Sequence, residues 1–359
     1  MFIKQKRKAN HKKDYFCFMI LVTGGTGLVG SHLLFKLVKT NAMPIRALYR
    51  NAHKLNAVKK VFSYYTNDVE NLYNKIEWIK ADINDITALE DAFKTISHVY
   101  HCAALVSFDP DKYHELRTVN IKGTANIVNL SISNNINKIC HVSSIAAIGK
   151  EANSNHLITE KTEWNPEQDN GVYAITKYGA EMEIWRGTQE GVDAVIVNPG
   201  IILGPGFWES SGSGSIYKKI HNGLNFHPKG TSGYIDVGDV SDSMIALMNS
   251  SIKNERYILI AENVSFKDFQ IKVAKALGVK PSKKEASVLL LSVAWRIDWM
   301  RHKLLGKPRI LSKQMARSIS RKSLFDNSKL ITDLHFKFTP IEESITTISN
   351  YYLKDFKSS

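Results

Sequence analysis

Short apolar runs alternate with amphipathic stretches along the first 260 residues of the chain. The apolar runs predict strands at Met19–Thr23, Ile45–Tyr49, Ile76–Lys80, His98–Ala103, Lys138–Ser143 and Ala194–Asn198. Between them, apolar residues at helical spacing predict helices at Leu28–Thr40, Ala88–Thr95, Leu116–Ser133 and Tyr173–Glu190. Strands that are apolar along nearly their whole length, each followed by a helix, are typical of a buried parallel sheet. We therefore expect an α/β fold built on a doubly wound parallel sheet.

The pattern changes after Pro199. Residues 204–233 are rich in Gly and Ser and predict irregular structure, and a helix at Val240–Met248 and a strand at Arg256–Ile260 then resume the earlier alternation. The last hundred residues are mostly helical. We predict a Rossmann domain at residues 19–261, with a smaller, discontinuous substrate-binding part formed by residues 200–235 and by residues 262–359.

The charge of the chain is unevenly distributed. The 359 residues include 48 Lys and Arg against 34 Asp and Glu, a net charge of +14. Residues 1–13 contain six basic residues and no acid, and residues 280–322 contain twelve basic residues with only Glu285 and Asp298. Basic segments are most often solvated surface. Because no zinc-finger or RNP-type spacing accompanies them, we expect no nucleic-acid partner.

The first 18 residues imitate a signal peptide, because a basic start leads into an apolar run. That run passes directly into the glycine-rich segment Thr23–Gly30 without a small-residue cleavage site. We therefore predict that residues 1–18 are a disordered basic extension or an overextended start of the reading frame.

Three cysteines in apolar segments indicate a reducing environment without disulfides, and no apolar run is long enough to span a bilayer. We expect a cytoplasmic protein.

Three glycines, Gly24, Gly27 and Gly30, separate the first predicted strand from the first helix. At this place they permit a tight turn, close approach of the backbone to a pyrophosphate, and a helix N-terminus that faces the anion.

An NAD enzyme places a carboxylate after the second strand, but no Asp or Glu occurs between Tyr15 and Asn67, and Arg50 ends that strand. A guanidinium suits a 2′-phosphate. We predict NADP(H) in preference to NAD(H); the alternative is that Arg50 only stacks on the adenine.

Tyr173 and Lys177 form an i, i+4 pair on one face of a predicted helix. A phenol has a pKa near 10, and a nearby ammonium favours its ionised form. Upstream, Ser143 and Ser144 end the fifth predicted strand, at the edge where parallel sheets bind ligands. A serine there can hold a substrate oxygen. In this context the three residue types predict a catalytic site.

Together these motifs resemble the extended short-chain dehydrogenase/reductases, the NAD(P)-dependent epimerase/dehydratase family, over residues 19–260. The segments that carry the resemblance are Thr23–Gly30, Ala81–Ile83, His101–Ala104, Val119–Thr124, Ser144, Tyr173 with Lys177, Asn198–Gly206 and Asp236–Val240. Nucleotide-sugar members often have Arg where this chain has Asn198. That departure and the apolar C-terminal part are more similar to the dihydroflavonol-reductase-like and 3β-hydroxysteroid-dehydrogenase-like branches.

The resemblance implies roles for particular residues. It makes Ser144, Tyr173 and Lys177 catalytic. It implies cofactor contacts from Gly24, Thr26, Gly27, Leu28, Val29, Gly30, Arg50, Asp82, Ile83, Ala103, Ala104, Lys177 and Pro199, and no metal. Members of the family often dimerise through a four-helix contact that includes the Tyr-x-x-x-Lys helix, which leaves a homodimer as an option.

We therefore predict an NADP-dependent oxidoreductase that interconverts a carbonyl and a secondary alcohol on a small apolar substrate. One alternative is a nucleotide-sugar epimerase or dehydratase that retains its cofactor. Another is an NADP-binding protein without activity. Aromatic residues of the segment after the sixth strand are candidates for an apolar substrate pocket or for packing of the smaller part: Phe207, Trp208, Tyr217 and Phe226.

The segment Ala286–Met300 is densely apolar and is followed by the basic residues Arg301–Lys303. Trp295 and Trp299 lie on one face if the segment is helical. The expectation we favour is a helix that packs its apolar face over the substrate cleft. The alternative is that part of this face lies on an anionic membrane surface and admits a lipid-like substrate.

Overall fold

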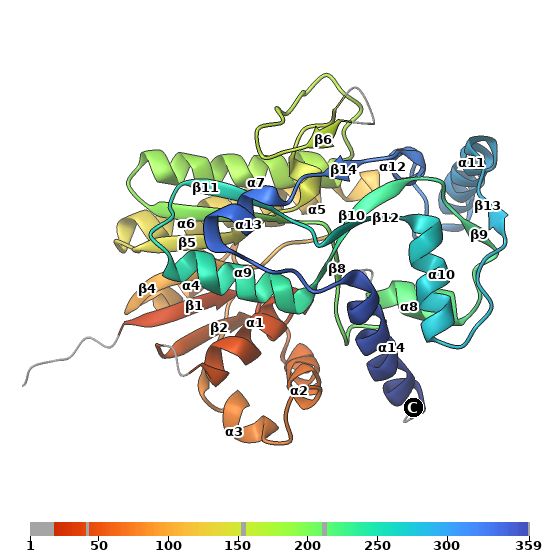
Figure 1. The fold of residues 1–359 in the computed structure, drawn as a ribbon. Coiled ribbons are helices and arrows are strands. Elements are labelled where there is room, and N and C mark those ends of the chain that lie inside the picture. The colour runs from red at the N-terminus through yellow and green to blue at the C-terminus, as the bar shows by residue number, and fades with distance from the viewer. Residues whose placement is uncertain (1–17, 41–42, 152–155, 210–213, 358–359) are drawn as a thin grey trace, which may run out of the picture.

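The computed structural model describes residues 18–40, 43–151, 156–209 and 214–357. All but the last residue of the extension predicted at residues 1–18 lies outside this range. Its centre is a seven-stranded sheet in the order β3-β2-β1-β4-β5-β7-β11, and all neighbouring strands are parallel (Figure 1). The strands are β1 (Met19–Thr23), β2 (Ile45–Tyr49), β3 (Ile76–Lys80), β4 (Ile96–His101), β5 (Lys138–Val142), β7 (Asp193–Pro199) and β11 (Glu255–Leu259). The predicted α/β fold with a parallel sheet is confirmed. Every predicted strand occurs within two residues of its expected ends.

Helices cover both faces of this sheet (Figure 1). On one face lie α1 (Leu28–Lys39), α2 (Leu55–Ser63), α9 (Val237–Asn249) and α13 (Ser328–Leu334); on the other lie α4 (Ile86–Phe93), α6 (Gly123–Ser133) and α7 (Val172–Gln189). Successive strand residues alternate between the two layers. In β1, Ile20 and Val22 join the first layer and Leu21 joins the second, and all three are buried. Burial on both faces explains why the strands are apolar almost throughout.

The structure differs from the expected helices in three places. Residues 55–73, for which the sequence analysis predicts no element, form α2 and the short α3 (Val69–Tyr73). The single helix expected at Leu116–Ser133 is divided into α5 (Tyr113–Leu116), a π-helical segment η3 (Arg117–Lys122) and α6. The segment expected to be irregular contains α8 (Gly214–His221) and the two-residue strand β9 (Phe226–His227). Short 3₁₀ segments occur at Ala52–Lys54 (η1), Pro110–Lys112 (η2) and Ile145–Ala147 (η4).

A smaller part of the chain has its own core beside the carboxyl ends of the main strands. Its three-stranded sheet consists of β8 (Ile201–Leu203), β10 (Thr231–Asp236) and β12 (Glu262–Ser265), in the order β12-β10-β8. Two helices, α10 (Phe266–Ala276) and α14 (Ile341–Lys357), pack with α8 around Tyr217, Tyr234 and Phe269. The aromatic residues there stabilise this part by burying large apolar area.

The C-terminal residues also return to the main sheet and to the cleft. Leu330 of α13 is buried in the same core as α1 and α9. The strand β14 (Leu324–Phe325) pairs with β6 (Leu157–Ile158), and β13 (Lys284–Glu285) pairs with β9. Between these strands lie α11 (Val288–Leu305) and α12 (Lys313–Ser320), which pack against each other. Among the residues that the structure describes, no helix is both long and apolar enough to cross a membrane.

Candidate active site

The β1–α1 turn forms a compact backbone cradle at the carboxyl end of the sheet. Gly24 has φ +68°, and a Cβ there would lie 2.6 Å from the backbone nitrogen of Ala103. A Cβ on Gly30 would lie 2.2 Å from the carbonyl oxygen of Gly24. Gly27 is the N-cap of α1 and brings no side chain to its free N–H groups. A pyrophosphate suits such a helix N-terminus because the N–H groups and the helix dipole both favour an anion.

The predicted cofactor residues all lie at this same edge. The β1–α1 turn and the start of α1 contain Thr26, Leu28 and Val29. The other predicted residues follow or end the neighbouring strands: Arg50 after β2, Asp82 and Ile83 after β3, Ala103 and Ala104 after β4, and Pro199 at the end of β7. The structure therefore gathers them as predicted, although Ile83 is buried against Gly123 in the core. The residues present fit a dinucleotide along the strand ends.

Arg50 and Asp82 form an exposed ion pair across the ends of β2 and β3. Their Nη1 and Oδ2 atoms lie 3.2 Å apart. Burial alone would raise the pKa of Asp82, but hydrogen bonds from Asn84 and Arg50 lower the pKa below its usual value. The carboxylate thus stays ionised beside the guanidinium, and sequence reasoning did not anticipate this pair.

A buried histidine links the turn to the helix behind it. The two ring nitrogens of His101 lie 2.7 Å from the Thr23 hydroxyl and 2.9 Å from the Thr124 hydroxyl. Burial, together with the nearby charge of Lys177, lowers the pKa of His101 to about 3. The neighbouring His141 is also buried, and its ring nitrogens have no hydrogen-bond partner among the described residues. Both histidines are neutral core residues near neutral pH.

Ser144 and Tyr173 meet beside the cleft, as their predicted roles require. Tyr173 is the second residue of α7, and Ser144 follows β5. Burial raises the pKa of Tyr173 to about 12, while a hydrogen bond with the Ser144 hydroxyl lowers it. The hydroxyl of Tyr173 is therefore protonated at neutral pH. Ser143, the alternative serine, has a buried hydroxyl without a hydrogen-bond partner among the described residues.

Lys177 lies one turn further along α7 and is fully buried. Its Nζ donates a hydrogen bond to the carbonyl oxygen of Val142 at 2.8 Å. Burial lowers the pKa of Lys177 to about 8, although the negative charge of Glu181 raises this pKa. The lysine is thus still mostly charged at neutral pH. Its predicted effect on the pKa of Tyr173 stays a prediction.

A polar network under α7 holds these residues. The side-chain amide of Asn198 donates to the carbonyl oxygen of Ser144 at 3.0 Å and to the Glu181 carboxylate. Glu181 is fully buried, and its other oxygen lies 3.4 Å from Arg256. Arg256 in turn donates to the carbonyl oxygen of Glu160. Glu181 is thus a buried structural residue that lies close to Lys177.

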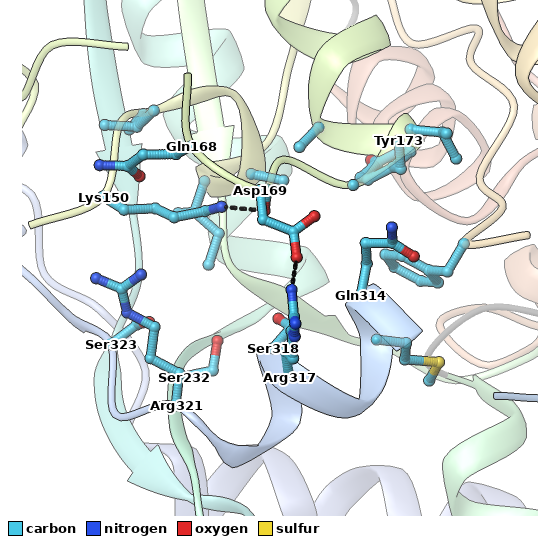
Figure 2. Close-up of a pocket in the computed structure, with 18 of the residues that line it drawn as sticks. Lys150, Gln168, Asp169, Tyr173, Ser232, Gln314, Arg317, Ser318, Arg321 and Ser323 are labelled. Carbon is cyan, nitrogen blue, oxygen red and sulfur yellow. Dashed lines mark hydrogen bonds and ion pairs between the residues drawn. The ribbon is translucent and has the colours of Figure 1, made fainter. Parts of the chain in front are cut away.

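A cavity of about 450 Å³ opens beside Tyr173, between η4, the start of α7 and α12 (Figure 2). Its apolar lining includes Phe108, Ile145, Ile148, Phe266 and Met315. Its charged lining residues are Lys150, Asp169, Arg317 and Arg321, and Figure 2 shows Lys150 and Arg321 on the side away from Tyr173. The cavity therefore combines an apolar wall with a basic end.

The basic end is only partly neutralised. Arg317 forms an ion pair with Asp169. Lys150 donates to the backbone oxygen of Asp169 at 2.8 Å, and Arg321 donates to the backbone oxygen of Glu151. Within the described residues neither of these two cations has a carboxylate partner. Three cations against one carboxylate leave an excess of positive charge at this end of the cavity.

The lining of the cavity was not predicted from the sequence. None of Phe207, Trp208, Tyr217 and Phe226 lines it, and Trp208 and Tyr217 instead pack with Tyr352 in the smaller core. The structure also differs from the expected cleft cover, because the cavity is lined by α12 and not by α11. Nothing in the spacing of residues 312–321 indicated that they approach α7, since this contact depends on tertiary packing.

The chain is similar to several curated proteins, some of which are named as reductases. A protein of Synechocystis sp. named as a candidate dihydroflavonol 4-reductase is 26% identical over 94% of both chains. Sterol demethylase protein B of Methylococcus capsulatus is 28% identical and covers 68% of this chain and 70% of its own. Cinnamoyl-CoA reductase 1 of Petunia hybrida is 25% identical, with coverage of 68% and 73%.

The fold and the family model agree with these similarities. UDP-glucose 4-epimerase from Thermotoga maritima superposes with a TM-score of 0.73 at 20% identity, covering 94% of this chain and all of its own, which shows the shared fold. The family model described as male sterility protein, an NAD-binding family, matches residues 22–247, well over half of the chain. The chain therefore belongs to this NAD-binding family, within the extended short-chain dehydrogenase/reductases.

Proposed function

We propose that this protein is an NADP-dependent oxidoreductase that interconverts a carbonyl and a secondary alcohol, with Tyr173 as the general acid and base. The observation that carries the proposal is the position of Tyr173 at the wall of the cavity, with Lys177 one turn further along the same helix and Ser144 near enough to affect the pKa of Tyr173. The reductase names among its relatives support the same kind of reaction.

Reduction needs a hydride at the carbonyl carbon and a proton at the carbonyl oxygen. NADPH, when bound, supplies the hydride. The chain supplies the proton, because Tyr173 keeps its hydroxyl protonated at neutral pH. Ser144 donates a hydrogen bond to the same oxygen and holds it near Tyr173. Lys177 places a positive charge on this helix and stabilises the phenolate that remains.

The cavity supports a substrate with two unlike ends. Phe108, Ile145 and Ile148 form an apolar wall at which an apolar group is held. Lys150 and Arg321 suit a carboxylate, a phosphate or a strongly polar group at the far end. We therefore extend the expected small apolar substrate to an amphipathic one. We propose a cytoplasmic location, because the thiols of Cys102 and Cys140 are free.

The proposal is tested by NADPH consumption with a panel of ketones, aldehydes and acyl thioesters, each with and without an anionic group. Tyr173→Phe keeps the ring and removes the proton donor, so we expect turnover to fall by about 10²–10⁴-fold. Tyr178→Phe is the matched control, because Tyr178 lies on the same helix and stacks on Trp164 at 4.5 Å. Equal turnover by Tyr173→Phe and the parent protein would remove Tyr173 from the reaction.

A further inference from the structure

Helix α11 presents a row of apolar side chains to solvent. Leu289, Val293, Ile297, Met300 and Leu304 recur at a spacing of four, four, three and four residues, which places them on one face. Each is between 46% and 76% exposed. We call these five residues the apolar row. Exposed large apolar side chains that are contiguous mark interaction surfaces.

The opposite face of α11 fixes the orientation of the helix. Leu291 is buried against Ala316 of α12, and Trp295 packs with them. Asp298, the one acidic residue of α11, is buried as well, and its carboxylate accepts hydrogen bonds from the backbone N–H groups of Ile310 and Leu311. The helix therefore buries its acid and exposes its apolar row. This is the reverse of an ordinary surface helix.

Basic residues border the apolar row. Arg296 and Lys303 lie along one side of it, as their spacing on the helix requires. On the other side Arg301 is held by an ion pair with Asp298. A further exposed cation, Lys307, follows the end of the helix. Figure 1 shows α11 at the outer edge of the C-terminal region, beside α12 and away from the seven-stranded sheet. The row and its cations are therefore accessible together.

We propose that α11 docks on an anionic membrane surface, with the apolar row in the interfacial region and the flanking cations on the lipid headgroups. A basic amphipathic helix that carries Trp and Leu lies in the plane of such an interface. The helix does not span the bilayer, because its other face is committed to α12. A second copy of the chain is a poorer occupant, since pairing two such faces brings like charges together.

Docking also connects the surface with the cavity. Helix α12 packs on α11 and lines the cavity with Gln314, Met315 and Arg317. One short helix thus separates the docked face from the space beside Tyr173. If the proposed function holds, an amphipathic substrate that partitions into the bilayer reaches the cavity from this side. The docking itself does not depend on that function.

Sedimentation of the full chain with vesicles tests the docking. We expect the protein to sediment with vesicles of phosphatidylcholine and 30% phosphatidylglycerol (about one anionic lipid in three) at low salt, and to be released at high salt. The triple variant Leu289→Gln, Ile297→Gln, Leu304→Gln should reduce the bound fraction roughly tenfold. The double variant Arg296→Gln, Lys303→Gln should reduce binding and its salt dependence.

The matched control is Ile86→Gln with Ile331→Gln, because both side chains are exposed apolar residues on other helices. It should bind like the parent protein, and all variants should keep the parent's thermal unfolding midpoint. The proposal fails if the parent protein stays in the supernatant with anionic vesicles at low salt, or if the triple variant sediments like the control. It also fails if sedimentation velocity shows a dimer that the triple variant abolishes, since the row would then be a protein interface.

Discussion

The guanidinium of Arg50 lies 3.2 Å from the carboxylate of Asp82, where the carboxyl ends of β2 and β3 meet. Both side chains are exposed, so this ion pair contributes on the order of 0–1 kcal/mol and is easily exchanged. A 2′-phosphate carries more charge than the carboxylate and accepts from a guanidinium in a bidentate manner. Under the proposed preference for NADP(H), the pair keeps Arg50 at the place where the 2′-phosphate binds.

The cofactor preference follows from this arrangement. We expect NADPH to bind more tightly than NADH by roughly 1–3 kcal/mol, and Arg50→Ala to remove most of that difference. Lys54→Ala is the control, because Lys54 is exposed on the adjacent 3₁₀ turn. Titration calorimetry with both cofactors measures the difference. Equal affinities in the parent protein would refute the preference.

Glu181 makes a second prediction, on the pH dependence of reduction. Its negative charge raises the pKa of Lys177, which burial lowers to about 8. Removing the charge should therefore lower this pKa further, and the alkaline loss of kcat/KM should begin at lower pH in Glu181→Gln than in the parent protein. Glu183→Gln is the control, since Glu183 pairs with Arg186 at the surface of the same helix. An unshifted alkaline limb in Glu181→Gln would show that Glu181 acts only in packing.

The basic end of the cavity predicts how substrates are ranked. Arg321→Ala should raise KM for an anionic carbonyl substrate by about 10-fold or more, while KM for its uncharged analogue changes little. The kcat of Arg321→Ala should stay unchanged for both substrates, because Arg321 lies away from Tyr173 in the cavity (Figure 2). Lys161→Ala provides the control on an exposed lysine that does not line the cavity. A uniform loss of kcat for both substrates would contradict anion recognition.

The positions of the main strands could be predicted from the sequence because each strand is buried on both faces. Leu21 and Val22 face opposite layers and are both fully buried, so apolar character continues along the strand and marks its ends. The place of the candidate site at the carboxyl ends of the strands could be predicted for the same reason. Ser144 and Arg50 follow such strands directly, and Tyr173 and Lys177 share one helix face.

The cavity could not be predicted, because its walls come from segments that are distant in sequence. Arg317 of α12 meets Asp169 across 148 positions, and this contact leaves no periodicity in either segment. Helix α2 was missed because it carries polar residues on most of its surface and buries only Val58, Val61 and Phe62. The hydrogen bond between Glu181 and Asn198 could not be predicted, because Glu181 lies on α7 and Asn198 on β7 and their approach depends on tertiary packing.

Buried histidines predict a loss of stability in acid. Burial lowers the pKa of His32 to about 4, whereas an unfolded histidine titrates near 6.5. Between these values the unfolded chain binds more protons, so the free energy of unfolding falls as pH drops from about 6.5 to about 4, by up to roughly 1.4 kcal/mol per pH unit for this group. Urea unfolding of His32→Gln across this range should show a shallower decline. His53→Gln, an exposed site, should decline like the parent protein, and an unchanged slope in His32→Gln would contradict the assignment.

NADPH that carries deuterium at the transferred position of the nicotinamide tests the reductase activity directly. We expect each alcohol that the parent protein forms to contain one deuterium at its carbinol carbon, with one NADPH consumed per alcohol. Tyr173→Phe should slow this transfer by at least about 100-fold. If substrate is converted while the cofactor stays bound and no net NADPH is consumed, the protein is an epimerase or dehydratase. If no label is transferred to any carbonyl substrate that binds in the cavity, the chain binds its cofactor without being a reductase.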